Sequence, residues 1–378
     1  MGFYSHSLHF TLFIKMKKQH GQFYTAVNPF HNKVIKWWLD KNIKPSDILL
    51  EPFAGSGNLV RMLEEVGFTN SWMQYDIEPA GSNIIQQDTF KNFPTGHRIC
   101  ITNPPYLSKT SAGTSGIPFP PSQFQDLYLH SLDLCLNNCD YVLAIVPCSF
   151  TNNDKLKSRL SIVIEITEQL FNDTQTPICI ALFNSESTKD YSVYCNDNFI
   201  GRFNDMKQGF PPHRNYLWDW NFSDKNGAIG FSSIDDVYSA SIYFTKGAAV
   251  AGKVLTSSNG AYKRISAPHN LDLDEFLHRL NKNLKYYRKA TDDIYLTTYY
   301  TLRKDGKYKR RLSNTEARML LDYTLDKTEP LQINRKLYLG DLGRELEIQH
   351  GLGYISPLSL LDDGLITLDG AEYFPIKV

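Results

Sequence analysis

Short apolar runs alternate with helix-like segments between about residues 45 and 183. Each run has four to six residues and is mostly apolar on both faces, which is typical of strands covered by helices on both sides. The alternation predicts an α/β fold with a doubly wound, mostly parallel, seven-stranded sheet. The runs are Ile48–Glu51, Trp72–Asp76, Ile84–Asp88, Ile99–Asn103, Tyr141–Val146, Ile162–Ile166 and Ile178–Phe183.

Two helices are predicted around the first of these runs. Leu59–Val66 is a helical segment that should end at Gly67, because glycine readily adopts the left-handed conformation that closes a helix. Before the first run, four large apolar residues fall at helical spacing and predict a helix that packs into the core: Phe30, Val34, Trp37 and Trp38.

The character of the chain changes near residue 200. Residues 201–270 are rich in Gly, Pro, Asn, Ser and aromatic residues, 271–284 have a helical pattern, and 285–311 are basic and rich in tyrosine. We therefore expect three parts: an extension over 1–20 without a functional role, an α/β domain over 21–200, and a C-terminal domain of mixed structure over 201–378. Met16 is an alternative translation start.

Composition narrows the class of protein. The 378 residues include 40 basic and 40 acidic side chains, so the chain as a whole is not a basic nucleic-acid binder. Six cysteines lie without CxxC pairs, which predicts no metal site and reduced thiols in an intracellular, cytoplasmic protein. No run approaches the roughly 18 apolar residues that a membrane span requires.

A loop of small residues follows the first predicted strand. Glu51 ends that strand, and Phe53, Ala54, Gly55, Ser56 and Gly57 lead into the next helix. Glycines let the backbone turn sharply and approach a ligand closely, and the amides at a helix start offer hydrogen bonds. An ordinary turn between strand and helix is the alternative explanation. The absence of a Gly-Lys-Ser/Thr sequence argues against a nucleotide-binding P-loop.

Two acidic residues end the next strands. Asp76, followed by Ile77, lies about 20 residues beyond the loop, where a carboxylate can accept hydrogen bonds from ribose hydroxyls. Asp88 ends the third strand, where a carboxylate could meet the exocyclic amine of an adenine.

The sequence Asn103-Pro104-Pro105-Tyr106 follows the fourth predicted strand. Two prolines fix the backbone and remove two N–H donors, so that carbonyl groups can face a cavity. The Asn103 amide oxygen and the Pro104 carbonyl supply two acceptors for a planar NH2 group, and Tyr106 supplies a ring on which a base can stack. This combination indicates a site that holds an amino group conjugated to an aromatic ring.

With this tetrapeptide and the Phe-Ala-Gly-Ser-Gly loop, residues 21–183 resemble the amino-methyltransferases of restriction–modification systems. The motif order is similar to the gamma arrangement, in which the carboxyl-terminal part recognises the target. The resemblance implies a class I S-adenosyl-L-methionine-dependent fold and a DNA adenine-N6 methyltransferase that transfers the methyl group directly to a flipped-out base.

The resemblance also assigns roles to single residues. It implies that S-adenosyl-L-methionine contacts Thr25, in Gly21–Thr25, together with Glu51, Phe53, Ala54, Gly55, Ser56, Gly57, Asp76, Ile77, Asp88 and Asn103. Phe171 matches the position of an aromatic residue that packs against the flipped base, or is simply part of the core. Pro147-Cys148 resembles the nucleophile pair of cytosine-C5 enzymes, but it follows the fifth strand where those enzymes carry it after the fourth.

Two segments outside the motifs are candidates for contact with nucleic acid. Residues 107–125, which include Lys109, are rich in Gly, Ser and Pro and predict a long loop that acts as a lid. Residues 285–311 hold nine basic against three acidic residues, interleaved with tyrosines, and predict a phosphate-binding surface or a solvated helix or hairpin face. The basic residues are Lys285, Arg288, Lys289, Arg303, Lys304, Lys307, Lys309, Arg310 and Arg311.

Other substrates remain open at this stage. Cytosine N4, RNA adenine N6 and release-factor glutamine are alternative methyl acceptors, and a non-catalytic nucleic-acid-binding protein on the same fold is an alternative of another class. The basic aromatic segment after the sheet favours double-stranded DNA as the partner. The resemblance further implies a monomer, with a restriction endonuclease as its functional counterpart.

Overall fold

The computed structural model describes residues 25–153, 155–172, 175–208, 218–256 and 260–327, and the backbone of a hairpin formed by β15 (Ile366–Asp369) and β16 (Glu372–Pro375). The first compact unit runs to Phe199 and the second comprises Ile200–Leu337. The extension predicted over 1–20, the alternative start Met16 and the motif residues Gly21–Tyr24 lie outside the described residues.

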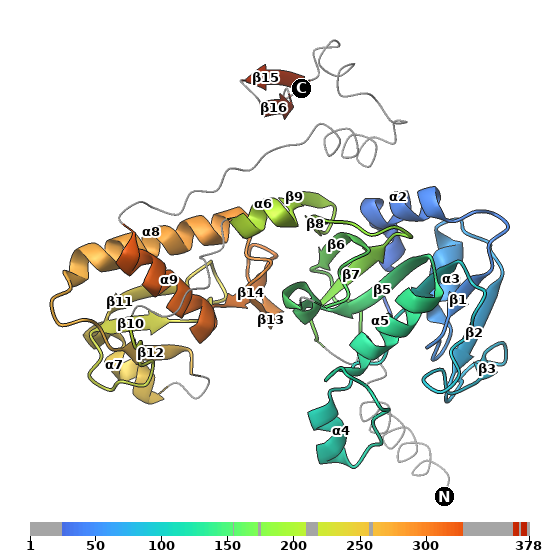
Figure 1. Ribbon diagram of the computed structural model, residues 1–378, viewed down its shortest axis with the longest axis horizontal. Helices are drawn as coiled ribbons and strands as arrows, with labels where there is room; N and C mark the ends of the chain where they lie inside the picture. The colour runs from blue at the N-terminus through green and yellow to red at the C-terminus, as the bar shows by residue number, and fades with distance from the viewer. Residues whose placement is uncertain are drawn as a thin grey trace, which may run out of the picture. The chain divides into compact units, whose positions relative to one another are not determined.

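The first unit is built on a nine-stranded sheet with the order β3-β2-β1-β4-β5-β7-β6-β8-β9 (Figure 1). Pairing is antiparallel between β7 and both its neighbours, whereas β1, β2, β3, β4 and β5 pair in parallel. The strands are β1 (Leu49–Glu51), β2 (Trp72–Asp76), β3 (Ile85–Gln86), β4 (Ile99–Thr102), β5 (Tyr141–Pro147), β6 (Leu160–Ile166), β7 (Ile178–Phe183), β8 (Ser192–Cys195) and β9 (Asn198–Arg202).

The predicted fold class is confirmed: the first seven strands form the mostly parallel α/β sheet expected from the apolar runs. The prediction missed β8 and β9, which extend the sheet beyond β6.

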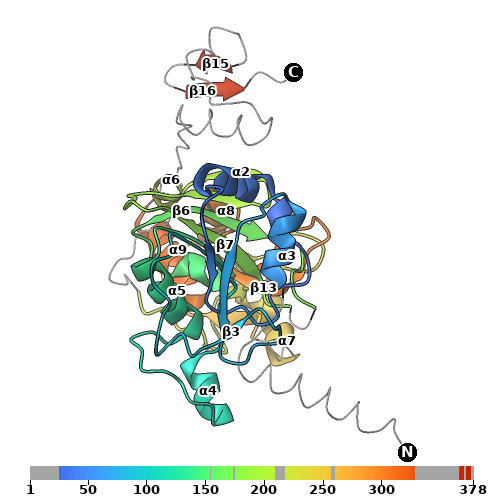
Figure 2. The same ribbon diagram turned by 90° about the vertical axis from the view of Figure 1, so that its right-hand side faces the viewer.

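Helices cover both faces of this sheet. Figure 2 shows α3 (Asn58–Glu65) and α5 (Leu127–Asn138) on opposite sides of it. The stripe of Phe30, Val34 and Trp38, on the short helix η1 (Pro29–His31) and α2 (Lys33–Asn42), is buried as predicted, and Trp37 packs against the same core. The Asn32 side chain caps α2 by accepting hydrogen bonds from the Val34 and Ile35 amides.

The segment 107–125 differs from its prediction as a long loop. Ser108 caps a helix, α4 (Lys109–Ser115), by accepting a hydrogen bond from the Ser111 amide. Gly116, at φ 67°, ends the helix, and its amide bonds back to the carbonyls of Ala112 and Gly113. The proline-rich stretch 117–121 follows. Between β5 and β6 lies one further short helix, η2 (Cys148–Asn152).

The second unit has its own core. A three-stranded antiparallel sheet of β11 (Tyr243–Lys246), β10 (Ile229–Ser232) and β12 (Tyr262–Ile265) packs with the long helix α8 (Leu273–Thr291) and with α9 (Asn314–Asp326). A hairpin of β13 (Thr297–Leu302) and β14 (Tyr308–Arg311) lies between these two helices in the chain. The remaining helices are α6 (Phe203–Gln208) and α7 (Gly247–Thr256). No helix in the described part of the chain is long and apolar enough to cross a bilayer.

Candidate functional site

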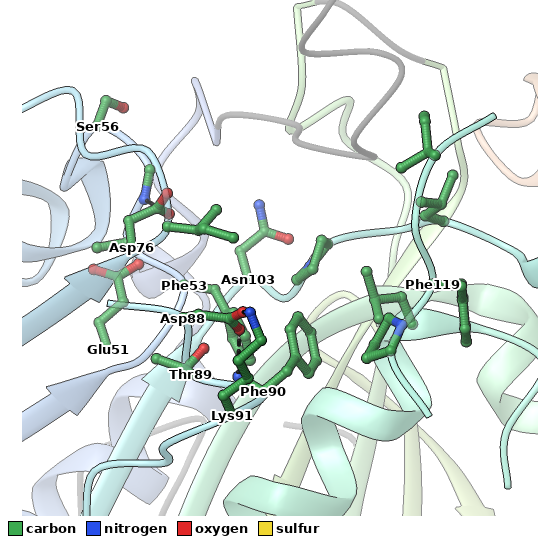
Figure 3. A pocket seen from close by; sticks show the side chains of 18 of the residues that line it. Glu51, Phe53, Ser56, Asp76, Asp88, Thr89, Phe90, Lys91, Asn103 and Phe119 are labelled. Carbon is green, nitrogen blue, oxygen red and sulfur yellow. Dashed lines mark hydrogen bonds and ion pairs between the residues drawn. The ribbon is translucent and has the colours of Figure 1, made fainter. Parts of the chain in front are cut away.

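A cavity of about 570 Å³ lies in the first unit, where β1, β2 and β4 end (Figure 3). These strands are neighbours in the order β2-β1-β4 and run in parallel, so their carboxyl ends meet at one edge of the sheet. Glu51, Asp76 and Asn103 come from these ends and share the cavity wall. A cavity of this size is in the range of small-molecule sites.

The loop after β1 turns sharply at its two glycines. Gly55 and Gly57 have φ values of 55° and 73°, in the left-handed region that favours glycine. A Cβ atom on Gly57 would lie 3.1 Å from the Gln74 side-chain nitrogen, so the position has little room for a side chain as well. The Gly57 amide closes the turn by donating to the Ala54 carbonyl, and α3 begins at the next residue.

Glu51 is a buried carboxyl group with one hydrogen-bond donor nearby. It is 2% exposed, and the Gln74 side-chain amide donates to it across 3.1 Å from the neighbouring strand. Burial raises the pKa of Glu51 well above its ordinary value; the Gln74 hydrogen bond opposes this shift and the nearby Asp76 carboxylate adds to it. A cationic ligand group that pairs with the Glu51 carboxylate would offset the free-energy cost of burying its negative charge.

The Asp76 carboxylate ties the β1 loop to the end of β2. One oxygen accepts from the Gly55 amide at 2.7 Å, and the other accepts from the Glu78 amide at 2.8 Å. Asp76 is 6% exposed yet lies in the cavity wall beside Ile77. Each oxygen keeps a second lone pair, so the carboxylate can still accept hydroxyl groups of a ligand.

Asp88 lies in the cavity wall, where it pairs with Lys91 at 2.9 Å. Phe90 follows, and its ring lies between Phe53, with centroids 5.2 Å apart, and His130, with centroids 5.3 Å apart and the rings stacked. This part of the cavity therefore combines a carboxylate with aromatic faces, which suits a flat ring that carries a donor.

Asn103 follows directly after β4. It lies between the part of the cavity wall formed by Glu51 and Asp76 and the part formed by Asp88 and Phe90 (Figure 3). Its side-chain nitrogen lies 3.4 Å from the Thr25 hydroxyl. The Tyr106 hydroxyl lies 2.9 Å from the Asn103 side-chain oxygen and 2.8 Å from the Ile145 carbonyl oxygen, so its single proton is shared between these two acceptors and links the tetrapeptide to β5.

Of the predicted cofactor residues, only Gly57 is outside the cavity wall. Those in the wall are Thr25, Glu51, Phe53, Ala54, Gly55, Ser56, Asp76, Ile77, Asp88 and Asn103. Among the predicted catalytic residues, Pro105 lines the cavity and Pro104 is buried beside it.

The two predicted stacking rings differ from expectation. Phe171 is 1% exposed in the core, pairs with Thr25 in an isolated bridge, and packs edge-on against Tyr106 at 6.1 Å. The Tyr106 ring also packs edge-on against Tyr128, and neither Tyr106 nor Phe171 lines the cavity. In this conformation Phe171 is enclosed in the core and the half-buried Tyr106 ring packs against it outside the cavity wall. Phe171 thus follows the alternative prediction, as a core residue.

Several wall residues were not predicted from the sequence. The apolar part of the wall comes from Leu107, the stretch 117–121, and Leu127 at the start of α5. The cluster of prolines around Phe119 is the sequence signal for this wall, but it predicts only a lid over 107–125 and no single contact residue. The remaining residues are Asn58, Leu59, Thr89, Phe90 and Lys91.

Much of the predicted phosphate-binding surface of the second unit is buried. Arg288 is 9% exposed and donates both to Asp235, at 2.9 Å, and to Asp293, at 2.6 and 2.7 Å. Arg303 is 6% exposed and bonds Asp235 at 2.9 Å, and Arg310 is 2% exposed. The prediction that these three arginines lie on a DNA-facing surface is wrong for this conformation, because their charges are enclosed.

The remaining basic residues are at least partly accessible. Lys307 pairs with Asp292 at 2.6 Å, whereas Lys109, Lys285, Lys289 and Lys304 are exposed and Lys309 and Arg311 are half-buried. Cys148 is 5% exposed and is not in the cavity wall. Among the described residues, no group of three or more His, Cys, Asp or Glu side chains could hold a metal ion.

No family model matches the chain, and no curated protein matches it. Solved structures that align with parts of the chain include the methyltransferase subunit of a type I restriction–modification system from Streptococcus thermophilus, at 16% identity and a TM-score of 0.35, covering 46% of this chain and 47% of that one. The M protein of the type I restriction enzyme EcoKI aligns at 12% identity and a TM-score of 0.35, covering 93% of this chain and 75% of that one.

The type IIG restriction endonuclease BpuSI aligns at 17% identity and a TM-score of 0.35, over 47% of this chain. The alignment spans only 27% of that endonuclease. At these identities and scores the similarities do not indicate what this chain binds or does, and the fold rests on its own strand order.

Proposed function

We propose that this protein is a DNA adenine-N6 methyltransferase that uses S-adenosyl-L-methionine. The observation that carries the proposal is the position of Asn103, in Asn-Pro-Pro-Tyr, between the acidic end and the apolar wall of one cavity. The two acceptors of this tetrapeptide suit a planar amino group.

The donor set of the cavity fits the cofactor. Glu51 is buried and lacks a cationic partner among the described residues, so it would bind the ammonium group of the methionine part. Asp76 would accept the ribose hydroxyls, and Asp88, beside Phe90, would accept the adenine amine. Bound S-adenosyl-L-methionine supplies an electrophilic methyl group.

The chain's own contribution to the reaction is to hold the acceptor. The Asn103 side-chain oxygen and the Pro104 carbonyl would accept hydrogen bonds from the two N–H groups of the target amine. These hydrogen bonds would direct the lone pair of the amine nitrogen toward the cavity. The Tyr106 hydroxyl keeps Asn103 in place. Burial raises the pKa of Tyr106 well above its ordinary value, so this hydroxyl remains a donor. Positioning of this kind can contribute up to roughly 7–11 kcal/mol.

A base inside a duplex cannot reach such a cavity, so we expect the target adenine to leave the helix, at a cost of a few kcal/mol. Because Phe171 is buried in the core and Tyr106 packs edge-on against it, outside the cavity wall, stacking of a base on either ring would require the segment 103–106 to move when DNA binds. The proposal includes a restriction endonuclease as the functional counterpart of this protein.

The test is methyl transfer from labelled S-adenosyl-L-methionine to unmethylated duplex DNA, followed by digestion to nucleosides and mass analysis. The proposal predicts N6-methyladenine. Labelled N4-methylcytosine would keep the enzyme class and correct the base, and label found only in RNA or in a release factor would refute DNA as the substrate. If the cofactor does not bind, both the cofactor assignment and the reaction are refuted.

A further inference from the structure

The second unit exposes a ridge of apolar and aromatic side chains, which we define as Val237, Tyr238, Tyr300, Leu302 and Lys304. Tyr238 and Tyr300 are 65% and 62% exposed, and Val237 and Leu302 are 45% and 43% exposed. The ridge joins the loop after β10 to the hairpin β13–β14, because the Lys304 amide donates to the Val237 carbonyl at 2.9 Å. The Lys304 ammonium lies over the Tyr238 ring, 4.4 Å from its centroid.

The buried carboxylate of Asp235 is hydrogen-bonded both to the loop after β10 and to the hairpin β13–β14. Its oxygens accept from Arg288 and Arg303 and from the Ser241 and Arg310 amides, at 2.8 to 3.1 Å. Burial alone would raise the pKa of Asp235, but the hydrogen bonds and charge of Arg288, with the backbone amides, lower it below its ordinary value. The loop and the hairpin are therefore joined through one ionised, fully enclosed group.

Tyr300 lies in a bulge of β13. Thr298 pairs with Arg310 and Leu302 with Tyr308, so three residues of β13 stand opposite Lys309 alone. Such a bulge bends the strand and changes the direction of its side chains. Tyr300 packs edge-on against Tyr299, with centroids 6.4 Å apart.

Lys304 is the cation of the ridge itself. Asp293 and Asp305 pair with Arg288 and Arg303, and Asp292 pairs with Lys307, so none of these three acids is the partner of Lys304. The bridge between Ile234 and Arg311 places another cation next to the loop. Asp236 is an exposed acid in this loop, and its carboxylate accepts from the Tyr238 and Ser239 amides.

We propose that this ridge is the surface of the second unit that contacts duplex DNA, with Lys304 on the phosphate backbone and the exposed tyrosines against sugars and bases in a groove. The inference rests on the proposed function and names the part of the chain that meets its substrate. A cation beside exposed apolar and aromatic side chains matches duplex DNA, whose phosphates attract the cation and whose minor groove accepts apolar side chains against sugars and between base steps. The buried arginines hold the ridge in place and do not touch DNA.

The test compares three variants of the full-length protein, Lys304→Ala, Tyr300→Ala and Tyr238→Ala, in binding to a fluorescent duplex over a range of salt concentrations. Lys304→Ala should weaken binding and reduce the slope of log K against log salt by about one. Each tyrosine variant should weaken binding by roughly fivefold or more with the salt slope unchanged. Cofactor affinity and urea unfolding should match the wild type.

Lys225→Ala is the matched control, because Lys225 is exposed in the loop at the opposite end of β10. Wild-type DNA affinity in all three ridge variants would overturn the inference while leaving the proposed function intact. The same is true if Lys225→Ala weakens binding as much as Lys304→Ala. If the wild type binds cofactor and methylates no nucleic acid, the proposed function itself fails, and the ridge proposal fails with it.

Discussion

The candidate residues of the two compact units lie in different surroundings: those of the first unit line a cavity, and several of those in the second are buried. In the first unit, residues from three separate motifs, Glu51, Asp76 and Asn103, converge on one cavity. In the second, the arginines of a basic segment turn inward, and Arg288 and Arg303 share the buried Asp235.

The difference shows what each kind of pattern can indicate. Parallel strands that are neighbours end at one edge of the sheet, so acids and amides at strand ends are brought together by the topology itself. A run of basic residues has no such constraint. Each guanidinium can reach solvent or an internal carboxylate, and one of the two carboxylate partners of Arg288, Asp235, lies 53 residues away in sequence.

The largest expected effect tests the structural role of the arginines. Arg288→Met should destabilise the protein by about 3–5 kcal/mol, because it leaves the Asp235 and Asp293 carboxylates buried with less positive charge beside them. Urea unfolding of the full chain measures this. Lys285→Met, one turn earlier on α8 and exposed, should change stability by no more than about 0.5 kcal/mol. Normal unfolding of Arg288→Met with lost DNA binding would make Arg288 a DNA contact after all.

A second prediction concerns the acceptor in the cavity. Asn103→Ala should lower the rate of methyl transfer on the order of 10²–10³-fold, comparable to the loss of one preorganised polar contact in other active sites. Cofactor affinity should stay within about threefold of wild type, since Asn103 is one of many wall residues. Single-turnover kinetics and titration calorimetry separate the two effects. Asn92→Ala, an exposed asparagine outside the cavity wall, is the control, and equal loss in both variants would argue against the assigned role.

A third prediction follows from the raised pKa of Glu51. A cationic ligand group favours the carboxylate, so binding should expel a proton, and cofactor affinity should increase by up to about tenfold per pH unit until the pH passes that raised pKa. Glu51→Gln should bind on the order of tenfold to a hundredfold more weakly at high pH and lose this dependence. Calorimetry in buffers of different ionisation enthalpy checks both. A pH-independent wild type would contradict the pairing.

The smallest effect concerns Gln74, whose hydrogen bond lowers the pKa of Glu51 against the effect of burial. Gln74→Met should move the break in the pH profile of cofactor binding upward and weaken binding at neutral pH by roughly fivefold. Gln86→Met, on the exposed strand β3, should leave the profile unchanged. An unshifted break in Gln74→Met would mean that Gln74 does not act through Glu51.

The alternation of apolar runs with helical segments was enough to predict the core of the fold. The runs Trp72–Asp76 and Ile178–Phe183 coincide with β2 and β7. The strand β7 is buried along its whole length, and such strands need continuous apolar stretches. The third strand is shorter than its run, and only Ile85–Gln86 pairs with β2. The strand β9 was missed because Asn198–Arg202 is mostly half-exposed and carries no such run.

The site residues that lie at strand ends could be predicted from the sequence. Side chains supplied by tertiary packing could not, because the apolar wall around Phe119 reaches the cavity through α4 and the segment after it. The direction of Tyr106 depends on the Ile145 carbonyl 39 residues away, so its packing against Phe171 could not be read from the tetrapeptide.

The most direct test of the account is a crystal structure determined with S-adenosyl-L-homocysteine at saturating concentration. We expect density for the ligand in the cavity, with its ammonium group at Glu51, its ribose at Asp76 and its adenine between Asp88 and the Phe90 ring. An empty cavity, or a ligand bound elsewhere in the chain, would contradict the assignment of this cavity as the site of methyl transfer.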